Sequence, residues 1–262
     1  MIVSCTSGIE DLLADELGEQ LCAVVLCDKQ GDFPAKTAKY KTDKVYLVEN
    51  PLLTDYNTDI SQSIIEKYKD LIINRSQEVA AILILDYGLK GIFEDLFIQK
   101  LMHLLKENYK NVPIIVRPTK SNYYLYENVE LIKMNLQKAL DTFSIDCCNE
   151  TSITIAGKRI LNSAKCKNVL LNYLELESFL FSKENERVEK ISPILHQPVR
   201  SYVAVGSVIM ATLGLSIASG SSILDGAKLS LYAAALTATC PPVEFYTAEK
   251  LQNFISNIIK NS

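Results

Sequence analysis

The feature of the sequence that most constrains its fold is an alternation between short apolar runs and longer segments with helical spacing. Val79–Leu85 is a continuous apolar run, and the helical segment Phe93–Leu105 separates it from a second run, Pro113–Val116. Continuous runs are typical of strands buried on both faces, and a helix between two such strands suits a right-handed crossover. We therefore expect the two strands to be adjacent and parallel in a three-layer α/β fold, with a mostly parallel central sheet and helices on both faces.

The same alternation extends along the chain. It predicts strands at Ile2–Ser4 and Ala23–Cys27, a hairpin around Phe179–Phe181 and Asn185, and helices at Ile9–Leu21, Ser61–Ile73, Val208–Ser219, Ile223–Leu236 and Ala248–Ile259. No repeat or low-complexity linker interrupts it, so we expect residues 1–262 to form one domain.

Composition excludes several classes of function. The net charge of −4 gives no overall positive field, so we expect no nucleic acid as a partner. The seven cysteines form no CxxC pair and both histidines lie far from any cysteine pair, so we expect no metal site. Scattered thiols without a basic leader near Met1 favour a cytoplasmic protein with reduced cysteines. The adjacent Cys147 and Cys148 are either a reactive pair or two unpaired thiols.

One segment is long enough to raise the question of a membrane. Ser201–Leu224 contains 24 residues without a charge, and about 20 apolar residues span a bilayer. Its three glycines and six serines instead suit a buried helix packed closely against a sheet. We therefore expect no membrane span.

Five segments in collinear order carry a resemblance to a known family. In Val79–Ile92, the strand and the turn Asp86-Tyr87-Gly88-Leu89-Lys90-Gly91 are similar to the S-D-Y-G-K-G turn of heptose-7-phosphate kinases, with Leu89 as one extra residue. The other four segments are similar to further motifs of the same kinases: Ile114–Pro118 to V-D-P-K, Asn135 to P-N-x-x-E, Asp32–Lys41 to T-x-x-K-x-R, and Val205–Gly220 to the helix that opens with G-A-G-D. The chain thus resembles ribokinase-type (PfkB-like) carbohydrate kinases, and most nearly the heptose-7-phosphate kinase domain of ADP-heptose synthase. The resemblance implies a ribokinase-like fold.

The resemblance also implies that the family's N-terminal strands and lid are missing before the point that matches Met1. A strand such as Ile2–Ser4 would then lie at an uncovered sheet edge, which exposes unpaired backbone groups. We expect a homo-oligomer or another protein to cover that edge. The alternative is that Asp32–Lys41 folds back over it, which requires Phe33 to be buried.

The position of the family's catalytic aspartate has lost its carboxylate. The G-A-G-D residues read Ala204, Val205, Gly206 and Ser207 here, so Ser207 stands where the resemblance places the base. A serine hydroxyl is a poor base near neutral pH, and a positioned base contributes about 10²–10⁴ in rate. We expect no catalytic residue in this degenerate phosphate loop, and we interpret Ser207 as a helix N-cap.

Other positions tied to phosphate, metal and nucleotide have changed as well. Arg117 replaces the aspartate of V-D-P-K, and Lys138 replaces the glutamate that helps to hold magnesium in the family. Asn135 is retained, either as a remnant of the nucleotide site or simply as a residue that suits a turn. Two carboxylates could replace the base, namely Asp86 at a strand end and Asp225, which also suits the first turn of a helix.

These observations favour a degenerate sugar-kinase-like protein without phosphoryl transfer, which acts as a binding or scaffold protein and needs no cofactor. Two alternatives stay open. One is an active heptose 7-phosphate kinase that uses ATP and magnesium, and the other is a sensor that binds a sugar phosphate or a nucleotide without turnover.

Overall fold

Our computed structural model describes residues 2–4, 23–27, 45–49, 79–86, 95–119, 121–173, 177–185, 188–192, 199–200, 205–240 and 247–260. The expected helices at Ile9–Leu21 and Ser61–Ile73, and the segment Asp32–Lys41 with Phe33, lie outside the described residues.

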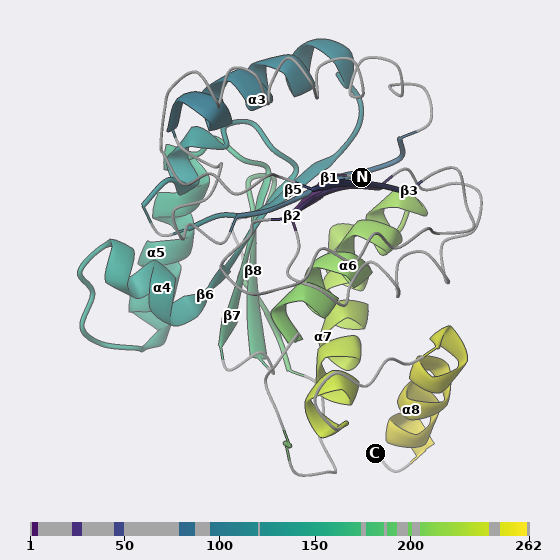
Figure 1. Ribbon diagram of the computed structural model, residues 1–262. Helices are drawn as coiled ribbons and strands as arrows, with labels where there is room; N and C mark the ends of the chain where they lie inside the picture. Colours follow the sequence, from purple (N-terminus) through teal and green to yellow (C-terminus); the bar gives the residue numbers. More distant parts are fainter. Residues whose placement is uncertain are drawn as a thin grey trace.

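The strands form two neighbouring sheets (Figure 1). The first contains β1 (Ile2–Ser4), β2 (Ala23–Cys27) and β3 (Val45–Glu49), all parallel. The second has the order β4 (Ile82–Leu85), β5 (Ile114–Arg117), β6 (Leu131–Asn135), β7 (Asn168–Tyr173), β8 (Glu177–Ser182) and β9 (Glu189–Ile191). β1 lies at one edge of the three-stranded sheet, as expected for Ile2–Ser4, and it is close to β4 of the six-stranded sheet.

The pairing confirms the sequence-based topology. β4 and β5 are adjacent and parallel, with Ile82 opposite Ile114. β6 and β7 continue the parallel order, and β8 and β9 pair antiparallel as the expected hairpin. The sheet is therefore mostly parallel, and its parallel strands place their carboxyl ends at one edge, which we call the carboxyl edge.

Helices cover both faces of the six-stranded sheet, which gives three layers (Figure 1). One face, the α3–α5 face, carries α3 (Asp95–Asn108), the 3-10 helix η2 (Tyr123–Leu125), α4 (Leu136–Thr142) and α5 (Glu150–Ser163). The other, the α6–α7 face, carries α6 (Val205–Ala218) and α7 (Ile223–Thr239), and α8 (Ala248–Lys260) packs against α7. The three-layer α/β prediction is confirmed.

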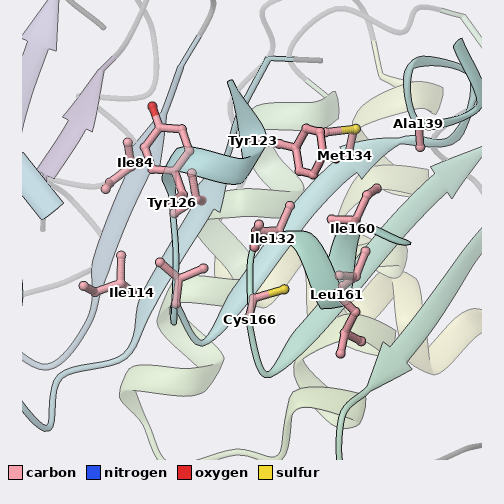
Figure 2. Close-up of a cluster of buried hydrophobic side chains, with 14 of the residues drawn as sticks. Ile84, Ile114, Tyr123, Tyr126, Ile132, Met134, Ala139, Ile160, Leu161 and Cys166 are labelled. Atoms are coloured by element: carbon pink, nitrogen blue, oxygen red, sulfur yellow. The ribbon is translucent and has the colours of Figure 1, made fainter. Parts of the chain in front are cut away.

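The alternation of side chains along each strand divides the core between these faces. Ile82 and Ile84 of β4 join the cluster of the α3–α5 face, whereas Leu83 and Leu85 join the cluster of the α6–α7 face. Figure 2 shows part of the α3–α5 cluster, including Tyr126, Ile132 and Cys166.

The α6–α7 face depends on close approach between helix and sheet. A Cβ atom on Gly214 of α6 would lie 2.7 Å from Cδ2 of Leu83, so only a glycine lets the helix sit this near to β4. Within the uncharged segment, Val205–Ala218 forms a buried helix on the sheet, as its small residues predicted. Among the described residues, no helix has the length and apolar character needed to cross a bilayer.

Candidate functional site at the carboxyl edge

The first turn of α6 lies at the carboxyl edge, over the end of β5. Val205, Gly206 and Ser207 are all buried there, with Ser207 only 8% exposed. A Cβ atom on Gly206 would lie 3.3 Å from both Cζ and Nη1 of Arg117. The guanidinium group of Arg117 therefore packs directly against the helix backbone at Gly206.

This geometry corrects one interpretation of Ser207. Because α6 begins at Val205, Ser207 lies inside the first helical turn and is not the N-cap. Ala204 lies outside the described residues. The backbone at the amino end of a helix carries partial positive charge, and the guanidinium group of Arg117 lies beside it.

A second cation, missed in the sequence, lies on the neighbouring strand. Lys133 of β6 is 1% exposed. The register that pairs Val116 with Ile132 places it next to Arg117, and by alternation both side chains belong to the α6–α7 face. The sequence could have indicated this residue, since Lys133 is a lone cation within the apolar run of β6.

Asp86 follows β4 at the same carboxyl edge, but its side chain belongs to the α3–α5 face. Its Oδ2 atom accepts hydrogen bonds from Nδ2 of Asn122 at 2.7 Å and from the Tyr126 hydroxyl at 2.9 Å. Oδ1 of Asn122 in turn accepts from the Thr119 hydroxyl at 2.6 Å. Burial, and then the Asp86 charge, raise the pKa of Tyr126 well above its usual value. This buried carboxylate fastens the segment of η2 to the sheet.

Asn135 has a structural role at the start of α4. Its side chain accepts from the backbone N–H of Lys138 at 3.2 Å, which makes it the N-cap. Its cross-strand neighbour Asn172 is fully buried and donates through Nδ2 to the Ser178 hydroxyl. Oδ1 of Asn172 has no hydrogen-bond partner among the described residues. The carboxyl edge thus continues from Arg117 into a row of amide and hydroxyl groups on β6, β7 and β8.

Asp225 lies far from this edge. It is in the first turn of α7, where its backbone N–H donates to Oγ of Ser222 and its carboxylate accepts from the same hydroxyl at 2.7 Å. Ile223 beside it lines an open hollow of about 530 Å³ together with Asn168 at the start of β7. α7 therefore starts at the amino ends of the parallel strands, and the role of Asp225 in a first helical turn is confirmed.

In the part of the chain that the structure describes, no three or more histidine, cysteine, aspartate and glutamate side chains gather closely enough to hold a metal ion.

Comparisons with known proteins agree with this arrangement, although no family model matches the chain. The bifunctional protein HldE of Geobacter metallireducens is 27% identical over 203 residues, which cover 75% of this chain and 40% of the relative. The HldE protein of Geobacter sulfurreducens is 26% identical over 169 residues, covering 62% and 34%. The chain thus spans about two fifths or less of the length of these relatives.

Solved structures share the fold. Phosphofructokinase-2 from Escherichia coli in complex with potassium has a TM-score of 0.62 at 16% identity, covering 78% of this chain and 63% of that one. Ribokinase from Arabidopsis thaliana with ribose and ATP has a TM-score of 0.60 at 15% identity, covering 71% and 59%. The tetrameric inhibited form of Escherichia coli phosphofructokinase-2 has a TM-score of 0.59 at 13% identity, covering 78% and 62%. The resemblance to HldE and to ribokinase-type sugar kinases is confirmed, and the fold is ribokinase-like.

Proposed function

We propose that the chain is a sugar-kinase-like protein that does not transfer phosphate and acts by binding a ligand or another protein. The observation that carries the proposal is the contact between the Arg117 guanidinium and Gly206 in the first turn of α6. In the kinases that the chain resembles, this turn opens with G-A-G-D and supplies the catalytic aspartate. Here the turn contains Ser207, and a cation lies against its backbone.

Neither of the carboxylates that could replace the base is suitably placed. Asp86 belongs to the α3–α5 face and already accepts hydrogen bonds from Asn122 and Tyr126. Asp225 lies at the opposite edge of the sheet and caps α7 with Ser222. Without a positioned base, we expect the rate to fall by about 10²–10⁴.

The test is a phosphoryl-transfer assay with ATP, magnesium and heptose 7-phosphate. We expect no product above the rate without protein. Turnover of about 0.1 per second, a tenth of the low end of common enzyme rates, that is lost in Ser207→Ala would overturn the proposal. Ser207→Asp alone should not restore activity, because other positions tied to phosphate and magnesium, Arg117 and Lys138 among them, have changed as well.

A second candidate is a sensor that binds a phosphorylated ligand without turnover. The observation that favours it is a pair of cations on adjacent strands, with Arg117 beside the first turn of α6 and the buried Lys133 next to it on β6. Guanidinium and ammonium groups with a helix amino end form a favourable environment for phosphate.

Calorimetric titration with ATP, ADP and heptose 7-phosphate separates the two candidates. A sensor should bind one of them, and Arg117→Gln should weaken that binding by about tenfold or more, the loss of roughly one charge-assisted hydrogen bond. Lys158→Gln, at an exposed position on α5, is the control and should leave it unchanged. Absence of binding in all three titrations would remove the sensor and leave a protein-binding role.

We also infer that the protein self-associates. The support is the ribokinase-like fold, shared with the tetrameric inhibited form of phosphofructokinase-2. Light scattering at micromolar concentration should give a mass of at least twice 29.3 kDa. A single species at 29.3 kDa would contradict self-association.

A further inference from the structure

The carboxyl edge carries cations at two positions where the resemblance places carboxylates. Lys138 stands at the position of the glutamate that helps to hold magnesium in the kinases, and Arg117 stands at the position of the aspartate of V-D-P-K. Lys138 is exposed in the first turn of α4, and its backbone N–H donates to Oδ1 of Asn135 at the end of β6. Each change replaces a negative charge at this edge by a positive one.

A third cation, Lys133, lies next to Arg117. The register of β5 and β6 places their backbones side by side at the strand spacing of about 4.8 Å, and by alternation both side chains belong to the α6–α7 face. Lys133 is almost completely buried, so its ammonium group stays at the sheet instead of extending into solvent. The guanidinium group of Arg117 packs against Gly206 in the first turn of α6. Positive charge therefore comes from two adjacent strands and from the amino end of a helix.

The two described carboxylates at the strand ends of this edge belong to the opposite face. Asp86 is held by hydrogen bonds within the α3–α5 face. Glu177, at the start of β8, forms an ion pair of 2.7 Å with Lys190, whose ammonium group lies over the ring of Phe179 in the α3–α5 core. On the α6–α7 face, the described strand ends and the first turn of α6 offer amide and hydroxyl groups but no carboxylate, namely Asn135, Asn172, Ser178 and Ser207.

This set of side chains does not fit magnesium. In phosphate sites the ion is held by one or two carboxylates together with oxygens of the phosphates, whereas guanidinium and ammonium groups bind phosphate directly. We propose that the site binds its phosphorylated ligand without magnesium, and that Arg117 and Lys133 supply the positive charge that the ion supplies in the kinases. The proposal rests on the sensor candidate, because it concerns the ligand of the same site.

The test is calorimetric titration with ATP, ADP and heptose 7-phosphate, first with EDTA and then with excess magnesium chloride. The ligand should bind in EDTA, and magnesium should raise its Kd by about threefold, because an ion on the phosphate oxygens reduces the negative charge that faces the cations. Binding that is tighter in magnesium, or that requires it, would overturn the proposal and leave the sensor in place. Absence of binding under both conditions would overturn the sensor and the proposal together.

Manganese provides a readout that needs no phosphorylated ligand, since it takes the same oxygen ligands as magnesium. The double variant Arg117→Asp/Lys138→Glu returns carboxylates to the edge and should bind Mn²⁺ at least about threefold more tightly than the wild-type chain in electron paramagnetic resonance titrations. Lys106→Asp/Lys158→Glu makes the same change in net charge at exposed positions on α3 and α5, and should leave the affinity for Mn²⁺ unchanged. Wild-type binding as tight as that of a folded Arg117→Asp/Lys138→Glu variant would overturn the proposal.

Discussion

The two faces of the six-stranded sheet are packed with side chains of different size. The α3–α5 face is filled by large side chains, including Phe97, Tyr126, Phe179 and Phe181. The α6–α7 face relies on small residues, including Gly206, Gly214, Ala227, Ala234 and Ala238. Large residues hold amphipathic helices at a distance, whereas small residues let α6 approach the sheet itself.

This difference in side-chain size coincides with a difference in role, because the α3–α5 face forms the structural framework and the α6–α7 face carries the candidate site. The polar groups of the α3–α5 face, Asp86, Asn122 and Tyr126, bond to one another and fasten a loop. On the α6–α7 face, Arg117 lies against the amino end of the closely packed α6, and Lys133 is its neighbour on β6. A helix that sits close to a sheet brings its partial charges near strand-end side chains, and this is the face on which the proposed sensor would bind its ligand.

The largest expected effect on stability comes from removing Asp86, whose hydrogen bonds hold the η2 segment to the α3–α5 face. Asp86→Ala leaves the buried amide of Asn122 and hydroxyl of Tyr126 without their acceptor, and we expect a loss of about 3–4 kcal/mol in unfolding free energy. Urea denaturation measures it. Asp141→Ala, which removes an exposed hydrogen bond to Gln137, is the control and should cost under about 0.5 kcal/mol. Similar losses of unfolding free energy in both variants would contradict the role of Asp86 in holding the η2 segment.

Close approach can be compared directly between the faces. Gly157 of α5 lies under the ring of Phe181, and Gly214 of α6 lies against the end of Leu83. Alanine at Gly157 meets a rigid ring and should cost about 2–3 kcal/mol, whereas Leu83 can rotate away and Gly214→Ala should cost about 1–2 kcal/mol. Lys158→Ala, exposed on α5, should be near neutral. Equal losses of stability at the two glycines would show that Phe181 and Leu83 move aside equally easily.

Alkaline sensitivity should arise from the α3–α5 face. Burial raises the folded-state pKa of Cys166 from 9.0 to about 12, and that of Tyr126 is also raised, so their contributions are complete below about pH 9 and are lost as pH increases. Between the unfolded and folded pKa values, each group lowers stability by about 1.4 kcal/mol per pH unit. Urea unfolding from pH 8 to 11 should therefore show a shallower decline for Cys166→Ala. The non-titrating variant Ile160→Val should retain the steep decline, and identical slopes in all three proteins would contradict the assignment.

The smallest effect concerns helix capping, which should not distinguish the faces. Ser222→Ala removes the cap of α7, and Asn149→Ala removes the equivalent cap of α5 on the other face. Each should lower stability by about 1 kcal/mol. Ser221→Ala is the matched control beside the first cap and should cost under about 0.5 kcal/mol. Thermal unfolding resolves the difference, and a much larger loss at α7 would indicate that its cap also positions the helix.

The sequence predicted the framework better than the site. β4 and β5 were recognisable because they are uninterrupted apolar runs flanking one helix. β6 was missed because Lys133 interrupts its run, and α5 was missed because β-branched residues and Gly157 obscure its helical spacing. The contact between Arg117 and Gly206 joins residues far apart in the chain, so no local pattern could indicate it. Ser207 was misplaced for a similar reason, since the start of α6 two residues earlier depends on packing against the sheet, which no local pattern indicates.

The buried Lys133 and the partly buried Arg117 of the α6–α7 face have a consequence during synthesis. All the described strands precede α6 and α7 in the chain, so this face of the sheet leaves the ribosome uncovered. At about 5–20 residues per second, its apolar surface faces water for several seconds before both helices are complete. Charges within such a surface oppose association with other nascent chains. We expect Arg117 and Lys133 to limit such association in the unfinished chain, before α6 and α7 are complete.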